Sequence, residues 1–197
     1  MSDVLCRRDG AVATITLNRP ERRNTISQPM VAALADHLLA CENDREVRVV
    51  VLTGAGQGFC AGLDLQDAAS AQGIEGGGFE LGASFDVQTA PPNILHRMDT
   101  PTICALNGSA AGYGMDLALC CDIRIAARSA KIAAAFTRRG VVPESGGTWL
   151  LPRLIGWGRA AEIVFAARTL SSEQCLELGL VNRIVADEEL AAAAEAL

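Results

Sequence analysis

Two acidic residues stand where their neighbours could turn them into proton-transfer groups. Asp116 falls one turn into an otherwise apolar stretch that is predicted to be helical, and Glu144 lies between apolar Val142 and a pair of glycines. A carboxylate that is removed from water has its pKa raised towards a value useful for proton transfer. Either residue could instead stabilise a helix N-terminus, where negative charge is favourable. The residue types therefore indicate acid–base chemistry but leave this alternative open.

Two glycine-rich segments could present backbone N–H groups to a ligand oxygen. The first spans residues 54–65, where Ala61-Gly62-Leu63 could expose its N–H groups, and the second opens a predicted helix at Gly112. The first turn of a helix has unpaired N–H groups and a positive dipole end, which favour an anion. The dinucleotide fingerprint fails because Phe59 stands where its third glycine is required, and the chain contains no Walker lysine. A plain glycine-rich turn is the alternative for the first segment.

The composition excludes several classes of protein. The 197 residues include 17 basic and 23 acidic side chains, which give a net charge of −6, whereas nucleic-acid binding needs a clustered basic patch. The apolar runs are much shorter than the roughly 20 residues that cross a bilayer, and the N-terminus lacks the pattern of a signal peptide. The seven cysteines show no zinc-site spacing and are interpreted as reduced core residues. We therefore expect a cytoplasmic protein with no metal site, no membrane association and no nucleic-acid partner.

Alternating strands and helices must position the candidate residues. Periodicity and glycine or proline breaks predict strands at 11–17, 47–52, 102–106, 123–127 and 181–185, and helices at 27–41, 112–120, 158–167 and 171–178. The alternation is typical of an α/β fold with a largely parallel sheet. The segment 66–92, rich in Gly, Ala, Ser and Gln, is predicted to be a mobile lid. A last helix, capped by Asp187, is predicted to be still running at Leu197, as if the chain were cut off there.

The motifs together resemble the enoyl-CoA hydratase/isomerase (crotonase) superfamily. The resemblance rests on segments 58–65, 107–124 and 143–156, with further matches at 18–24, 167–172 and 179–181, so it extends over essentially the whole chain. It implies a spiral of ββα units with mostly parallel sheets. The chain would form a single domain over 1–197, with a core at about 1–185 and the start of a truncated C-terminal helical region at 186–197.

The resemblance also implies a binding site for a CoA thioester. The thioester oxygen would lie between the backbone N–H groups of Leu63 and Tyr113. No cofactor is expected beyond the CoA of the substrate, and a homotrimer or hexamer is expected if the C-terminal helices are present. For the phosphates of the CoA, the resemblance points to Arg22 or Arg23, and for its adenine to Ala61, Asp64 and Leu65. The other residues that it implies for binding the CoA or acyl group are Asn24, Gly62, Gly112 and Pro143.

The acids depart from the hydratase pattern of two glutamates that flank one water. Asp116 occupies the first position with one methylene fewer, and the second position falls on Phe136. Glu144 directly follows Pro143, an arrangement that resembles enoyl-CoA isomerases. The main hypothesis is that Glu144 moves a proton between two carbons of a 3-enoyl-CoA. The alternatives are hydration of a 2-enoyl-CoA by Glu144 and Asp116 together, and a non-catalytic CoA-binding or scaffold protein.

Overall fold

The structure is a computed structural model that describes residues 2–64, 89–143 and 145–197. Leu65 and Glu144, two of the predicted site residues, lie outside the described residues, as does most of the predicted lid at 66–92. The end of that segment belongs to helix α3 (Pro91–Arg97), so the loop stops earlier than expected. Its two prolines fit the first turn, where a backbone N–H has no helical partner.

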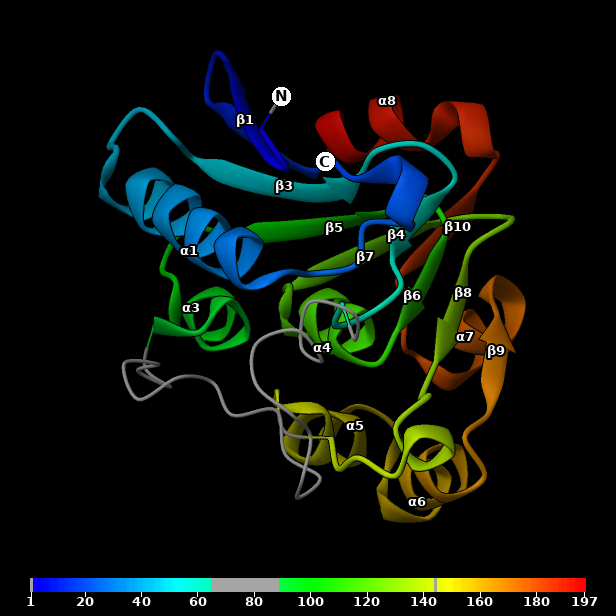
Figure 1. Ribbon diagram of the computed structural model, residues 1–197. Coiled ribbons are helices and arrows are strands. Elements are labelled where there is room, and N and C mark those ends of the chain that lie inside the picture. The colour runs from blue at the N-terminus through cyan, green and yellow to red at the C-terminus, as the bar shows by residue number, and fades with distance from the viewer. Residues whose placement is uncertain (1, 65–88, 144) are drawn as a thin grey trace.

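A six-stranded sheet forms the upper layer in Figure 1, with the strand order β1-β2-β3-β5-β7-β10. β1 pairs with β2 in antiparallel fashion, and the other neighbours pair in parallel. Every residue of β5 is buried, as is typical of a central parallel strand covered on both faces. The strands are β1 (Val4–Asp9), β2 (Val12–Leu17), β3 (Val49–Gly54), β5 (Thr102–Leu106), β7 (Ile123–Ala127) and β10 (Arg183–Val185).

A second sheet has four short strands in the order β4-β6-β8-β9. β4 follows β3, β6 follows β5 and β8 follows β7, so each of these long strands continues into a short strand of the second sheet. A long strand is thus followed by a short strand three times along the chain, and helix α4 follows the second of these pairs. This arrangement confirms the predicted mixed α/β fold with mostly parallel sheets. The strands are β4 (Gly58–Cys60), β6 (Ser109–Ala111), β8 (Lys131–Ala133) and β9 (Thr169–Ser171).

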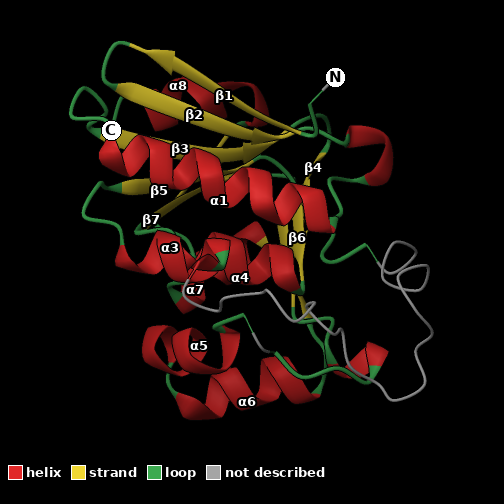
Figure 2. Ribbon diagram, turned by 60° about the vertical axis from the view of Figure 1, so that its left-hand side comes forward, coloured by secondary structure: helices red, strands yellow, loops and turns green. Residues whose placement is uncertain are grey.

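Helices cover both faces of the larger sheet. Figures 1 and 2 show α1, α3 and α4 on one face, α8 on the other, and α5 with α6 in a further layer beyond α4. α1 begins as predicted after Ser27, whose side chain accepts a hydrogen bond from the Met30 N–H. α7 begins with the predicted capping box of Ser171 and Gln174. The remaining bounds are α1 (Gln28–Asn43), α4 (Tyr113–Cys120), α5 (Gly147–Ile155), α6 (Trp157–Phe165), α7 (Ser172–Leu178) and α8 (Leu190–Glu195), with 3₁₀ turns at Pro20–Arg22, Thr137–Arg139 and Asp187–Glu189.

Some elements differ from the expectations. The sequence patterns do not indicate β1, whose exposed, charged residues at the sheet edge hide the alternation of a strand. They also miss α5 and the three-residue strands of the second sheet. Asp187 does not cap the last helix, because its Oδ1 accepts a hydrogen bond from the Ser129 N–H at 3.0 Å. That helix, α8, ends at Glu195 and does not run to Leu197.

The buried residues include six of the seven cysteines, all free thiols, whereas Cys6 is exposed on β1. Burial thus agrees with the interpretation of the cysteines as core residues at every position but one. In the part of the chain that the structure describes, no helix is both long enough and apolar enough to cross a membrane.

Candidate active site

The segment after β4 is held in an extended conformation beside Ile26. The Ile26 N–H donates to the Gly62 carbonyl at 2.8 Å, and the Asp64 N–H donates to the Ile26 carbonyl at 2.8 Å. Because successive N–H groups of an extended chain point to opposite sides, the N–H of Leu63 points away from this bridge. The pairing therefore fixes the direction of the Leu63 N–H.

Gly62 brings this segment close to the start of α4. Its φ of +102° lies in the region that favours glycine, and a Cβ at this position would lie 3.0 Å from the Ala111 carbonyl and 3.9 Å from the Tyr113 nitrogen. Figure 1 shows the chain leaving β4 beside the first turn of α4. Within residues 2–64, 89–143 and 145–197, neither the Leu63 N–H nor the Tyr113 N–H donates a hydrogen bond to another residue. Two backbone donors therefore lie near each other, one of them at the positive end of a helix.

Asp116 is fully buried in the first turn of α4. Its Oδ1 lies so close to Gly147, the first residue of α5, that a Cβ on this glycine would collide with it. The N-terminus of a helix is favourable for negative charge, so the start of α5 can stabilise the Asp116 carboxylate. The structure thus joins Asp116 to the segment that carries Pro143, which is buried, and Glu144, which lies outside the described residues.

The groups around Asp116 are protonated at neutral pH. Burial raises the pKa of the Tyr113 hydroxyl well above its usual value, and Cys60, Cys120 and Asp116 raise it further. Burial likewise raises the pKa of the Cys60 thiol to about 12 and that of Cys120 well above its usual value. These thiols therefore contribute no thiolate nucleophile to the site.

A buried ion-pair cluster anchors the segment that carries Leu63. Asp64 is 3% exposed, and both of its carboxylate oxygens lie 2.8 Å from Nη2 of Arg22. Nη1 of Arg19 lies 3.3 Å from Oδ2, and the Thr25 hydroxyl donates to the same oxygen at 3.2 Å. The carboxylate of Asp64 therefore holds two loops together, and the contact of Asp64 with an adenine ring stays a prediction.

The side chain of Asn24 links its own loop to the loop that contains Ala55 and Gly58. Its side chain is completely buried; Oδ1 accepts from the Arg19 N–H at 2.8 Å, and Nδ2 donates to the carbonyls of Ala55 and Gly58 at 2.9 and 2.8 Å. All polar atoms of this side chain are used within the protein, and a role of Asn24 in binding CoA stays a prediction.

The neighbouring Arg23 is exposed, and its carbonyl accepts a hydrogen bond from the Ala61 N–H at 3.0 Å. Ala61 is likewise exposed, on the segment that leads to Leu63. The predicted residues on these two loops therefore lie together. Arg23 is a better candidate for a phosphate contact than Arg22, whose charge is offset by Asp64.

Comparison with known proteins agrees with this arrangement. The family model of enoyl-CoA hydratase/isomerase matches residues 7–197. The chain belongs to this family. It is 44% identical over 200 residues to 1,2-epoxyphenylacetyl-CoA isomerase of Escherichia coli, and the aligned region covers 100% of this chain and 75% of the relative. It is 35% identical to the short-chain-enoyl-CoA hydratase of Clostridium acetobutylicum, over 96% of this chain and 71% of the relative.

Solved structures of the family share its fold. The monofunctional enoyl-CoA isomerase of M. smegmatis superimposes with a TM-score of 0.80 at 36% identity, over 98% of this chain and 82% of that one. The enoyl-CoA hydratase of Bacillus anthracis gives a TM-score of 0.89 at 34% identity, over 99% and 74% of the two chains. Both hydratases and isomerases are therefore built on this enoyl-CoA hydratase/isomerase fold.

A buried aromatic ring lies beside the start of α4 in this enoyl-CoA hydratase/isomerase chain. Phe136, at the position where the resemblance places the second hydratase glutamate, is buried, and its Cε1 lies 3.8 Å from where a Cβ of Gly112 would be. An apolar ring therefore covers the start of α4 at the point where a second acid would be expected.

Sequence reasoning missed three contributions to the site. Arg19 and Thr25 bind Asp64 from about 40 positions away, and such a spacing leaves no local signal. The sequence shows Gly147 as part of a glycine pair but does not identify Asp116 as its neighbour. A residue without a side chain at the start of a helix is the one indication that another group packs closely there.

Proposed function

We propose that this chain is an enoyl-CoA isomerase that moves a double bond in an acyl-CoA thioester by proton transfer at Glu144. The observation that carries the proposal is that Gly62 brings the segment with the Leu63 N–H close to the Tyr113 N–H. A thioester oxygen placed between these donors would be stabilised as it gains negative charge, an effect worth several kcal/mol in comparable sites. The dipole of α4 acts in the same direction.

The proton transfer needs one carboxylate and no water. Removal of a proton from a 3-enoyl-CoA gives a dienolate whose charge rests on the thioester oxygen, and the same group can return the proton at another carbon. Glu144 is proposed for this role on its sequence position after Pro143. The buried ring of Phe136 supports isomerisation over hydration, because phenylalanine cannot transfer a proton at the position of the second hydratase glutamate.

The CoA moiety is proposed to lie along the loops that carry Arg23 and Ala61, both of which are exposed. The guanidinium of Arg23 would contact phosphate, while the cluster around Asp64 keeps the loops in place. The proposed reaction uses no cofactor, because the CoA is part of the substrate. The expected homotrimer or hexamer and the cytoplasmic location remain predictions, and light scattering on the chain tests the first of them.

Hydration of a 2-enoyl-CoA is the second candidate function. A specific observation favours it, since the Asp116 carboxylate is buried in the same turn of α4 that offers the Tyr113 N–H. Asp116 and Glu144 could then share one water as acid and base. The close contact with Gly147 speaks for a positioning role of Asp116 instead.

The deciding experiment supplies a 2-enoyl-CoA and a 3-enoyl-CoA of equal chain length and follows the products by mass. We expect isomerisation of the 3-enoyl substrate without a gain of water, and at least a thousandfold loss of the rate in Glu144→Gln with binding retained. A gain of one water from the 2-enoyl substrate would establish the hydratase instead. Binding of both thioesters without turnover would establish a non-catalytic protein.

A further inference from the structure

Tyr113 places a hydroxyl inside the protein, where no described residue pairs with it. It is the only tyrosine of the chain and the first residue of α4, and its side chain is 9% exposed. Among the residues that the structure describes, none forms a hydrogen bond with its hydroxyl. Buried polar groups are normally paired, because leaving one unpaired costs stability. A phenylalanine would fill the same space without this cost.

Tyr113 belongs to the same side of α4 as Asp116, the buried acid of the candidate site. Asp116 and Cys120 follow Tyr113 at helical spacings of three and seven residues, which put all three on one side of α4. This side faces the start of α5, where Gly147 contacts Asp116 and a Cβ at Gly146 would lie 3.7 Å from the Cys120 sulfur. The backbone N–H of the same Tyr113 is the proposed donor to the thioester oxygen. A tyrosine hydroxyl is several ångström from its own N–H, so the two groups would contact different atoms of a bound acyl-CoA.

The chemistry of the surroundings limits what the hydroxyl can bind. Because burial and the neighbouring Cys60, Cys120 and Asp116 raise the pKa of Tyr113, the phenol keeps its proton and can donate it in a hydrogen bond. The nearby Asp116 carboxylate disfavours an anionic ligand group through like-charge repulsion. An uncharged oxygen, such as that of a ketone, ether or alcohol, satisfies both conditions.

We propose that the Tyr113 hydroxyl donates a hydrogen bond to an uncharged oxygen on the acyl group, and that the chain therefore prefers acyl-CoA substrates that carry such an oxygen. The inference rests on the proposed acyl-CoA function and adds a substrate class to it. Tyr113 is a specificity-determining residue in this proposal, and Glu144 remains the proton-transfer group.

The test compares binding of three saturated thioesters that cannot react: hexanoyl-CoA, 4-oxohexanoyl-CoA and 5-oxohexanoyl-CoA. Isothermal titration calorimetry gives the Kd of each with the wild type and with Tyr113→Phe. We expect the wild type to bind at least one keto ligand about threefold to tenfold more tightly than hexanoyl-CoA, the usual value of one net hydrogen bond. Tyr113→Phe should lose this gain, so that it binds the keto ligands no more tightly than hexanoyl-CoA.

Thermal unfolding is a second measurement. It tests whether the Tyr113 hydroxyl stabilises the protein itself. Tyr113→Phe should melt at the wild-type temperature or above it, because no internal hydrogen bond is lost. Thr102→Val is the matched control: Thr102 is 1% exposed, and its hydroxyl donates to Asp122 at 2.7 Å, so removal of this partnered group should lower the melting temperature.

The possible outcomes separate the two proposals. If hexanoyl-CoA binds and neither keto ligand gains affinity from Tyr113, the inference about Tyr113 is overturned while acyl-CoA binding stands. If Tyr113→Phe melts clearly below the wild type, the hydroxyl has a partner within the protein and the inference is again overturned. If none of the three thioesters binds to the wild type, the proposed function fails together with it.

Discussion

The carboxylate of Asp116 lies directly against Gly147, so the first turn of α4 and the first turn of α5 meet without room for another methyl group. Asp116 is wholly buried at this contact. The segment 143–146 ends here, and the residue proposed to move the proton belongs to that segment. The contact between two helix starts therefore controls where this segment can lie.

We predict that Gly147→Ala lowers both stability and turnover. The added methyl group would push the Asp116 carboxylate and the start of α5 apart, and overpacking of this kind costs about 1–3 kcal/mol. Urea unfolding measures the loss of stability, and steady-state kinetics measure the loss of kcat. Gly158→Ala on α6 is the control, because a Cβ there meets nothing within 4 Å, and alanine is favoured over glycine in a helix.

A double mutant identifies the atoms responsible. If Asp116 is the obstacle, the destabilisation caused by Gly147→Ala should shrink in an Asp116→Ala background, since the colliding carboxylate is gone. Equal costs in the two backgrounds would contradict the assignment.

We predict that Gly62→Ala lowers kcat far more than it weakens CoA binding. An alanine would be strained at φ +102° and crowded by the Ala111 carbonyl, and a shift of the segment would misplace the Leu63 N–H. Loss of one such donor costs about 100-fold to 1,000-fold in kcat. Gly10→Ala provides a control with φ +56° and open space around its Cβ; it should lower stability and leave kcat unchanged. A normal kcat in Gly62→Ala would show that this segment is not part of the catalytic machinery.

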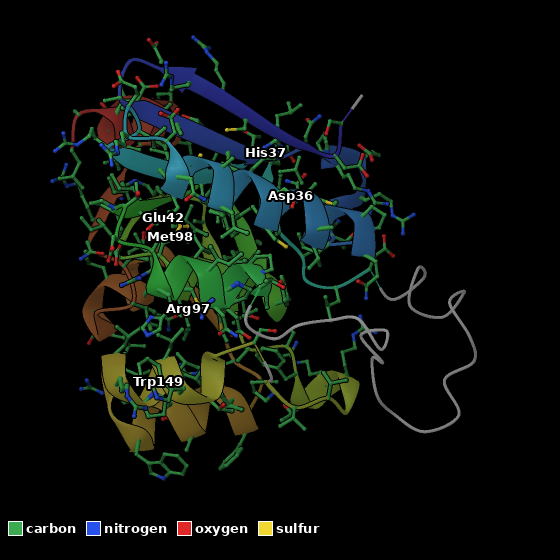
Figure 3. The ribbon with its side chains drawn as sticks, turned by 90° about the vertical axis from the view of Figure 1, so that its left-hand side faces the viewer. Asp36, His37, Glu42, Arg97, Met98 and Trp149 are labelled. Carbon is green, nitrogen blue, oxygen red and sulfur yellow. The ribbon has the colours of Figure 1, made fainter. Side chains whose placement is uncertain are left out.

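Glu42 should contribute stability that disappears in acid. Burial alone would raise its pKa, but hydrogen bonds from Thr100 and from the backbone N–H of Asp99 outweigh this effect and lower it. Its two carboxylate oxygens accept from the N–H groups of Asp99 and Thr100 at 3.0 and 3.1 Å. Figure 3 shows Glu42 near Met98, where the end of α1 meets the segment after α3.

A carboxyl group with a lowered pKa stabilises the fold above its unfolded-state pKa, and this contribution is lost as the pH falls through the folded-state value. Glu42→Gln should therefore cost about 1 kcal/mol at pH 7. The difference in stability from the wild type should shrink towards zero as the pH falls below 4.5, the ordinary pKa of a glutamate. Chemical denaturation at several pH values measures it, with the exposed Glu177→Gln as a reference. A cost that stays constant down to low pH would rule out the charged hydrogen bonds as its source.

The cysteines should differ sharply in reactivity. Burial raises the pKa values of Cys60 and Cys175 to about 12, whereas Cys6 is exposed. Because the thiolate is the reactive form, iodoacetamide at pH 8 should modify Cys6 in the folded protein and all seven cysteines after unfolding. Mass spectrometry of peptides reads the result. Modification of Cys60 in the native state would show that solvent reaches the wall beside the donors.

The sequence supports some parts of the site better than others, for physical reasons. Strong local patterns predicted α4, with its apolar run after Gly112, and α7, with its capping box. The strands of the second sheet have only three residues each and depend on pairing with distant partners, so no local pattern marks them.

The hydrogen bonds of Asn24 and Asp64 likewise have no local signal in the sequence. The resemblance places both residues near the CoA and does not indicate the partners that they have within the protein. Their actual partners lie about 30–40 positions away: Asn24 binds the carbonyl of Ala55, and Asp64 binds Arg22. The side chain of Tyr113 was likewise overlooked, because burial of a lone tyrosine depends on the packing of α4 against α5.

The bonds that tie residues 19–26 to residues 55–64 also affect the order in which the site can form. Leu63 obtains its direction from Ile26, and its loop is anchored by Arg22 through Asp64. The other donor, Tyr113, lies some 50 residues further along the chain. Contacts between such distant segments close only after the intervening chain has been ordered. We therefore expect the two donors to become neighbours only late in folding, so that the proposed site for a thioester oxygen requires the completed fold.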